Sequence, residues 1–144
     1  MLSREQIEAM IPHKGSMCLW DAVVEWDARR IALRADNHRG ATHPLRSQDR
    51  LRAVHLCEYG AQAMAVHGGL RAHGGDASPG LLVALRGVQL HVSYIDALPG
   101  ALECEAEVLA EGEGSQQYAF RIRHAGELLA EGRAAVMLQA VGAA

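Results

Sequence analysis

The chain has 144 residues, a formal net charge of −3 and 49% hydrophobic residues, of which few are aromatic. This length is common for one domain and the apolar content is enough for a core, so we expect a single domain over residues 1–144. The negative net charge and the lack of a basic stripe interleaved with aromatic residues argue against a nucleic-acid partner.

The amino-terminal third predicts a short helix followed by a β-hairpin. Ser3 with Gln6 three residues later forms a capping-box pattern, and Pro12 should end the helix that it opens. Residues 17–27 and 30–37 favour strands, since hydrophobic and polar side chains alternate along the second run. We expect these two strands to pair as an antiparallel hairpin.

The middle of the chain predicts a loop and then the longest helix. Residues 37–50 contain Gly, Pro, Ser and Asp without apolar periodicity, which is typical of an irregular loop. Residues 51–67 carry apolar side chains at spacings of three and four, so we expect a helix there. The glycines at positions 68, 69, 74 and 75 should end it in a connector that runs to residue 80.

The last third predicts strands at residues 81–95, 101–111, 115–124 and 127–138, separated by glycine-containing turns. A hairpin before one long helix and a meander after it are typical of an α+β fold. We expect a curved antiparallel sheet wrapped around the central helix.

One carboxylate stands out within the predicted central helix. Glu58 lies among Ala, Gly, Val, Leu, Met and Cys residues, with Tyr59 and Gln62 beside it. A charged group in apolar surroundings must pair, reach water, or hold a raised pKa that suits it to proton transfer. The third possibility indicates an enzyme.

Three motifs in order resemble the hotdog-fold 3-hydroxyacyl-[acyl carrier protein] dehydratases. They are Ile11-Pro12-His13 leading into Met17 to Asp21, Glu58 to Gln62 in the helix, and Arg86-Gly87-Val88 followed by Pro99-Gly100. The resemblance extends from Ile11 to about Met137. It implies a hotdog fold and the loss of water from a 3-hydroxyacyl thioester to give the trans-2-enoyl thioester.

The resemblance also implies roles for individual residues. Glu58 matches the helix acid, which protonates the leaving hydroxyl group. The His-Phe-Pro-Gly loop of the family is absent, and His43, fifteen positions before Glu58, is carried over as the base. His55 is the rival, since it precedes Glu58 by three residues on the same helix. His13, Tyr59 and Gln62 are expected to line the substrate site.

Seven arginines between residues 28 and 52 against two aspartates predict a positive end of the molecule. This cluster is either an ordinary solvated face or a landing site for an acidic carrier protein. We expect Arg46, Arg50 and Arg52 to receive acyl carrier protein near the mouth of the substrate tunnel. Coenzyme A thioesters remain an alternative substrate form.

We expect no metal or nucleotide cofactor, since histidine and cysteine spacings match no metal motif and the glycine-rich run lacks a phosphate-loop ending. Three distant cysteines in apolar runs favour reduced thiols. Charged residues near the amino terminus argue against a signal peptide, and no uncharged apolar run is long enough to span a membrane. A soluble cytoplasmic protein is therefore expected.

Two further hypotheses stay open beside the dehydratase. The missing histidine loop favours a non-catalytic dehydratase-like subunit that binds an active partner. The chain resembles small dehydratase-like proteins that accompany polyketide or aryl polyene assembly lines, where an active and a degenerate copy can pair. A hotdog thioesterase would use the same helix carboxylate to orient water. For the dehydratase, the resemblance implies a dimer, with His43 and Glu58 of one site coming from different chains.

Overall fold

The computed structural model describes residues 1–11, 14–72 and 82–137. Within these residues, seven strands form one antiparallel sheet and a long helix lies against it. The elements are β1 (Leu2–Ser3), α1 (Arg4–Glu8), η1 (Gly15–Met17), β2 (Ala22–Trp26), β3 (Arg30–Ala35), η2 (Ala53–His55), α2 (Leu56–Arg71), β4 (Leu82–Leu90), β5 (Leu102–Gly112), β6 (Ser115–His124) and β7 (Glu127–Met137).

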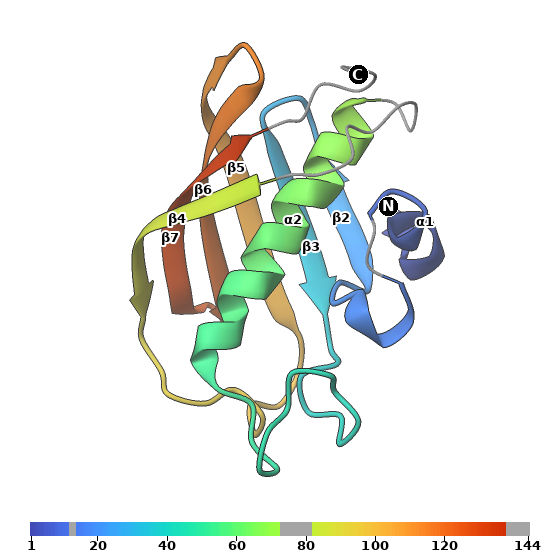
Figure 1. The fold of residues 1–144 in the computed structure, drawn as a ribbon. Helices are drawn as coiled ribbons and strands as arrows, with labels where there is room; N and C mark the ends of the chain where they lie inside the picture. Colours follow the sequence, from blue (N-terminus) through green and yellow to red (C-terminus); the bar gives the residue numbers. More distant parts are fainter. Residues whose placement is uncertain (12–13, 73–81, 138–144) are drawn as a thin grey trace.

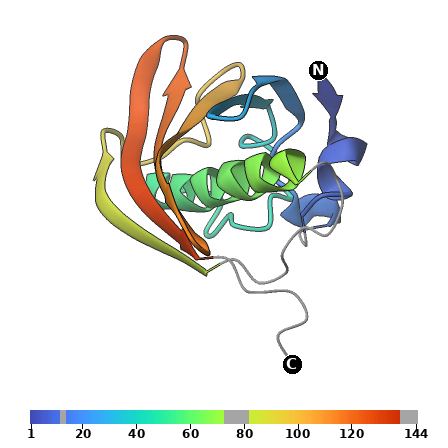
Figure 2. The same cartoon turned by 90° about the horizontal axis from the view of Figure 1, so that it is seen from above.

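The sheet has the strand order β1-β2-β3-β5-β6-β7-β4, and each neighbouring pair is antiparallel. It curves around α2, which runs across its hollow face (Figures 1 and 2). This α+β arrangement confirms the predicted hotdog fold. The carboxylate-bearing helix is thereby enclosed on one side by the sheet.

The β2–β3 hairpin is confirmed, together with its turn. The Asp27 carboxylate accepts hydrogen bonds from the backbone N–H groups of Arg29 and Arg30, and so closes the turn between the strands. Along β3 the side chains of Ile31, Leu33 and Ala35 are buried and alternate with more exposed positions. The predicted alternation therefore places the apolar face of β3 in the core.

The amino-terminal capping box is also confirmed, but α1 is shorter than predicted. The Ser3 hydroxyl accepts from the Gln6 N–H, and the Gln6 side chain accepts from the Ser3 N–H. The helix ends at Glu8 instead of continuing to Pro12, which lies outside the described residues. Ile7 is its buried anchor, because the short helix has one apolar position facing the core.

The predicted bounds of the central helix were wrong at both ends. Leu51 instead pairs with a neighbouring chain segment, because its N–H donates to the Asp96 carboxylate and its carbonyl accepts from Ile95 N–H. At the other end, Gly68 and Gly69 lie within α2 instead of ending it. A β-carbon on Gly69 would lie only 3.1 Å from the Met10 β-carbon, so this glycine permits close packing. The predicted connector beyond residue 72 lies largely outside the described residues.

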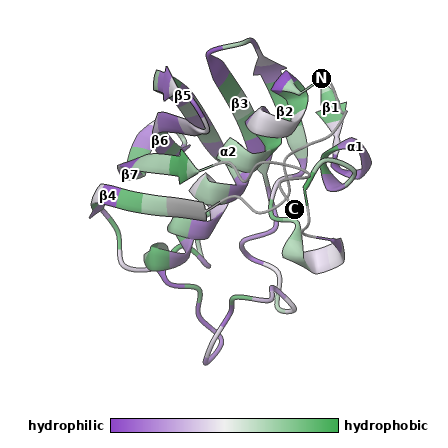
Figure 3. Ribbon diagram, turned by 45° about the horizontal axis from the view of Figure 1, so that its top comes forward, coloured by the Kyte–Doolittle hydropathy of each residue, from purple (hydrophilic) through white to green (hydrophobic). Residues whose placement is uncertain are grey.

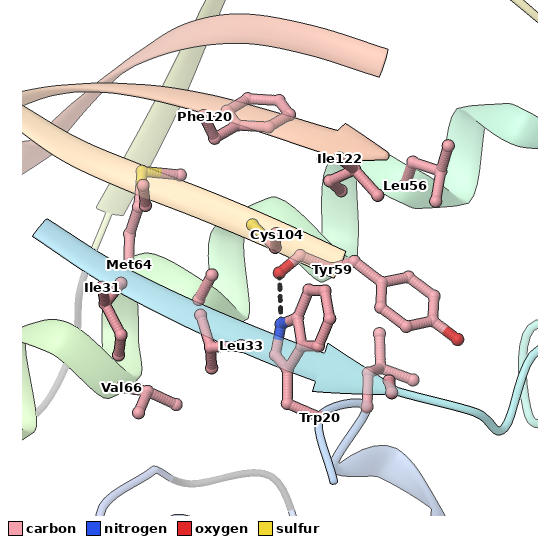
Figure 4. Close-up of a cluster of buried hydrophobic side chains, with 14 of the residues drawn as sticks. Trp20, Ile31, Leu33, Leu56, Tyr59, Met64, Val66, Cys104, Phe120 and Ile122 are labelled. Carbon is pink, nitrogen blue, oxygen red and sulfur yellow. Dashed lines mark hydrogen bonds between the residues drawn. The ribbon is translucent and has the colours of Figure 1, made fainter. Parts of the chain in front are cut away.

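The core forms where α2 packs on the sheet. Figure 4 shows Trp20, Leu33, Met64 and Phe120 among the side chains gathered between helix and strands. A β-carbon added to Gly60 would lie 2.9 Å from the Phe120 ring, so the helix approaches β6 more closely than any larger residue would allow. Small residues on α2 thus allow the helix to pack closely against the aromatic rings of the core.

Two predicted strands are shorter in the structure. The run 17–27 forms a strand only over β2, although Cys18, Leu19 and Trp20 are fully buried. The reason is that side chains, described below, bind the backbone of this segment in place of a neighbouring strand. The run 81–95 ends as a strand at Leu90, while β6 has the predicted bounds.

Strand β4 forms one edge of the sheet, where its only described partner is β7. The sheet strands show alternating hydrophobic and hydrophilic bands, whereas β4 is mostly hydrophobic (Figure 3). Leu85 and Leu90 on this strand are 37% and 40% exposed. An open apolar edge of nine residues is a natural place for another chain to pair.

No helix in the described parts of the chain has the length and hydrophobicity needed to cross a membrane. All three cysteines are free thiols; Cys18 and Cys104 are buried and Cys57 is half-buried. Burial raises the pKa of each thiol, so these groups stay protonated and act as small apolar side chains.

Candidate active site

Glu58 is a half-buried carboxylate in the first turn of α2. The Gln62 side chain, one turn further along the helix, donates from Nε2 to Glu58 Oε1 at 3.3 Å. Gln62 is itself buried and fixed, because Nε2 also donates to the Met17 carbonyl and Oε1 accepts from Leu19 N–H, both at 2.8 Å. The helix and the Met17–Leu19 segment together orient the carboxylate.

Tyr59 connects the helix to the loop that follows β3. Its hydroxyl donates to Asn37 Oδ1 at 2.6 Å and lies 3.0 Å from His43 Nε2. Its carbonyl accepts from the Trp20 indole N–H, drawn as the dashed line in Figure 4, and the Trp20 ring packs edge-on against the Tyr59 ring. Burial raises the pKa of Tyr59, so its hydroxyl keeps its proton.

His43, the base implied by the resemblance, is buried and has both ring nitrogens engaged. Nδ1 accepts from the Leu45 N–H at 3.1 Å, and Nε2 faces the Tyr59 hydroxyl. Burial lowers the pKa of His43, and the nearby His55 and Arg46 act in the same direction. The ring is therefore neutral at physiological pH and is held by the network.

His55, the rival base, lies at the amino-terminal end of α2 and is half-buried. Within the described residues its ring forms no hydrogen bond or ion pair. Its lone pair is therefore accessible in a way that those of His43 are not. His13, the third histidine expected at the site, lies outside the described residues.

The three arginines expected to receive a carrier protein differ in how they are held. Arg46 donates to the carbonyls of Gly40, Asp49 and Arg39, and so braces the 37–50 loop. Its guanidinium is committed to the backbone of its own loop. Arg46 therefore fits a structural role better than a docking role.

Arg50 and Arg52 are exposed and lie at the start of the segment that leads into α2. Arg50 pairs with Asp96 at 3.1 Å and stacks on the Tyr94 ring, with 3.8 Å from its guanidinium carbon to the ring centroid. Arg52 lies 5.7 Å from the centroid of the same ring. Of the two, Arg52 has no carboxylate partner among the described residues and is the more available cation.

Two further histidines are buried with His43, and we call these three the buried histidines: His38, His43 and His67. His38 Nε2 lies 2.7 Å from the Leu98 carbonyl. His67 bridges the Tyr118 hydroxyl and the Asp27 carbonyl. Burial lowers the pKa of all three, although the carbonyl contacts of His38 and His67 act in the opposite direction.

The described residues contain no group of three His, Cys, Asp or Glu side chains placed to hold a metal ion.

Comparison with known families identifies the chain. The sequence pattern of the ApeP-like family, described as ApeP dehydratase, matches residues 5–142. The chain belongs to the ApeP-like dehydratase family. A search of proteins with curated descriptions returned no match.

Solved structures similar to this ApeP-like chain share its fold at low sequence identity. The dehydratase heterocomplex ApeI:P from Xenorhabdus doucetiae has a TM-score of 0.81 and 20% identity over 94% of this chain and 91% of that chain. AziG from S. sahachiroi has a TM-score of 0.61 and 16% identity, covering 83% of this chain and 91% of that one. The thioesterase HI1161 from Haemophilus influenzae has a TM-score of 0.62 and 12% identity, covering 96% and 92%.

The structure of this ApeP-like chain brings Glu58, Tyr59, Gln62 and His43 into one region and adds Asn37, which sequence reasoning missed. Asn37 accepts from Tyr59 and donates from Nδ2 to the Leu19 carbonyl at 2.6 Å. The available signal was weak: Asn37 is the last residue of an expected strand and the first residue of the expected loop. The roles of Glu58 and His43 in catalysis and of Tyr59 and Gln62 in substrate binding stay predictions.

Proposed function

We propose that this chain is a subunit of a dehydratase that removes water from a 3-hydroxyacyl thioester on acyl carrier protein, giving the trans-2-enoyl thioester. The observation that carries the proposal is Glu58, a half-buried helix carboxylate held by the anchored amide of Gln62. Membership of the ApeP-like dehydratase family supports this reaction class.

In the proposed reaction a base takes the proton from the carbon next to the thioester carbonyl. The C–O bond at the third carbon then breaks, and the Glu58 carboxyl group protonates the departing hydroxyl, which leaves as water. Glu58 is partly accessible, so a substrate can reach it, while the apolar residues of α2 exclude bulk water from one side.

For the base, the hydrogen bonds favour His55 over His43 within one protomer. A general base needs a lone pair directed at the substrate, and both nitrogens of His43 already face protein groups. His55 stands three residues before Glu58 with a ring free of hydrogen bonds to the described residues, so acid and base would project from one region of the helix. A histidine from a partner subunit is the alternative.

The proposal includes a partner subunit. The solved relative from Xenorhabdus doucetiae is described as a dehydratase heterocomplex, and we extend a paired arrangement to this chain. The open edge of β4, with exposed Leu85 and Leu90, supports pairing through an added strand. A homodimer and a complex with a second dehydratase-like chain are the two forms to distinguish.

We also propose that the acyl carrier protein docks at Arg50 and Arg52. Both cations are exposed and flank Tyr94, whereas Arg46 is held by its own loop. Opposite charges guide such docking and raise the association rate, and salt screens the attraction.

A non-catalytic partner role is the second candidate function, and the engaged ring of His43 favours it. If this chain only shapes an active partner, Glu58 would help to line the site without transferring a proton. A thioesterase activity is the third possibility, and the likeness to solved thioesterases bears on the fold alone.

The test uses the purified chain alone and mixed with a candidate dehydratase-like partner chain. Each sample is incubated with 3-hydroxyacyl and trans-2-enoyl groups on carrier protein, and the products are measured by mass spectrometry of the acyl-phosphopantetheine. We expect interconversion of the two thioesters and its loss in Glu58→Gln, which keeps shape but removes the titratable proton. Full activity in Glu58→Gln assembled with a wild-type partner would assign the non-catalytic role, and free acid would assign a thioesterase.

A further inference from the structure

A continuous chain of hydrogen bonds begins at the 37–50 loop and enters the core. Leu45 N–H donates to Nδ1 of His43, so this nitrogen carries a lone pair and no proton. The proton of the neutral ring is then on Nε2, which donates to the Tyr59 hydroxyl. That hydroxyl donates to Asn37 Oδ1, and Asn37 Nδ2 donates to the Leu19 carbonyl.

The network reaches the helix through the backbone of Leu19, whose carbonyl and N–H lie in two successive peptide groups joined by the α-carbon. Leu19 N–H donates to Gln62 Oε1, and Gln62 Nε2 donates to the Glu58 carboxylate and to the Met17 carbonyl. Two peptide groups fix the orientation of the Gln62 amide, since a carbonyl can only accept and an N–H can only donate. Every bond from His43 to Glu58 therefore points in the same direction.

Leu19 divides the network into two series, because its carbonyl and its N–H belong to different peptide groups. Within each series the hydrogen bonds polarise one another, so that each donor strengthens the next, whereas Leu19 couples the two series by its position. The first series begins at a neutral ring that must donate from Nε2, and the second ends at a carboxylate that accepts. In the opposite tautomer of His43, the proton on Nδ1 would face the Leu45 N–H. The lone pair on Nε2 would then face the oxygen of the Tyr59 hydroxyl, whose proton is donated to Asn37.

We propose that His43 and Asn37 are positioning residues that act on Glu58 by fixing the backbone of Leu19, which in turn orients Gln62, with His43 held in the neutral form that carries its proton on Nε2. His43 is then the anchor of the network instead of the base. The catalytic part of this inference rests on the proposed function, whereas the tautomer and the coupling do not.

Nuclear magnetic resonance of the labelled full chain tests the inference directly. Nitrogen shifts of the His43 ring in the wild type should report a proton on Nε2 at neutral pH. In Asn37→Ala, the resonances of the Gln62 side-chain N–H₂ and the Glu58 carboxyl carbon should shift, although the hydrogen bonds of Asn37 go to Tyr59 and Leu19 and not to these two residues. The control Asp36→Asn changes the exposed neighbour and should leave these signals unmoved.

Tyr59→Phe provides a second variant if Asn37→Ala does not fold. It removes the hydroxyl and keeps the ring that packs against Trp20. The inference predicts the same movement of the Gln62 and Glu58 signals. A His43 proton on Nδ1, a charged ring at neutral pH, or unmoved Glu58 signals in both variants would overturn it.

An activity measurement connects the network to the reaction. Asn37→Ala removes both hydrogen bonds of the Asn37 side chain, so it should lower kcat roughly tenfold or less while KM changes little. If the wild type with its partner is inactive but the resonance results hold, the proposed function fails and the network stands. If the enzyme is active and Asn37→Ala keeps the wild-type kcat, the positioning role fails alone.

Discussion

The packing of α2 on β6 can be tested with two alanine substitutions in the same helix. Gly60 and Gly68 are both interior positions of α2, but only one faces a neighbour. A β-carbon on Gly60 would meet three carbons of the Phe120 ring at 2.9, 3.0 and 3.1 Å, whereas one on Gly68 would meet nothing within 4 Å. The pair therefore separates helix propensity from packing.

The expected magnitudes follow from these distances. Alanine is favoured over glycine in a helix interior by about 1 kcal/mol, so Gly68→Ala should raise the free energy of unfolding by about that amount. Gly60→Ala gains the same term but overpacks the core, which costs about 1–3 kcal/mol. Movement of the Phe120 ring away from α2 is limited by the backbone of Gly132, its cross-strand neighbour, because even a β-carbon built there would lie 3.1 Å from the ring. Gly60→Ala should therefore be neutral to about 2 kcal/mol destabilising.

Urea unfolding followed by circular dichroism measures both variants at fixed protein concentration. The difference between them should be about 1–3 kcal/mol, which is several degrees in Tm for a chain of this size. Phe120→Leu should relieve the clash, so Gly60→Ala should be less harmful in that background. If Gly60→Ala stabilises the protein as much as Gly68→Ala, the close approach of α2 to β6 is wrong.

Three further predictions concern the site and its surroundings. With the partner present, His55→Ala should lower the dehydration rate by about 10²–10⁴-fold if His55 is the base. His43→Ala should lower the rate less when both variants are compared at equal folded fraction. The reverse order would assign the base role to His43. Arg52→Glu should raise KM for carrier-bound substrate but not for a short pantetheine thioester, and the wild-type preference for the carrier form should shrink with salt; equal effects on both substrates would refute docking there. The buried histidines have pKa values below the ordinary value of about 6.5, so the unfolded chain binds more protons below that pH. The free energy of unfolding should therefore fall as pH decreases from about 7 through 6.5 toward the lowered folded pKa values. Urea unfolding at several pH values measures this. A free energy that does not fall over this range would contradict the burial of these histidines as neutral rings.

Much of the fold was predictable because periodicity and turn residues report local structure directly. The β2–β3 hairpin, the long helix and the bounds of β6 follow from alternation, apolar spacing and glycine-containing turns. The helix end was missed for a tertiary reason. Gly68 and Gly69 are poor helix formers, but Gly69 packs against Met10, and the contact that keeps the helix intact is 59 residues away in sequence.

The candidate site was predictable only in part. Glu58 was identifiable because a carboxylate is unusual in an apolar helix. The engagement of His43 was not, since it depends on Tyr59 from the helix and on the Leu45 N–H, which spacing from Glu58 does not encode. Asn37 was missed for the same reason, because an asparagine at the end of a strand is most often a turn residue.

A strand was predicted at residues 17–20 but is not formed there, and the same hydrogen bonds explain both this difference and the geometry of the candidate site. In a regular strand, the N–H and carbonyl of Leu19 would bond to a neighbouring strand, and Gln62 and Asn37 would lose their partners. Because β2 begins only at Ala22, the buried residue Leu19 has no strand partner among the described residues. Its backbone N–H donates to Gln62 and its carbonyl accepts from Asn37. The backbone of Leu19 thus holds the Gln62 amide that orients Glu58. Through Asn37, the same residue connects the helix to the loop that carries His43.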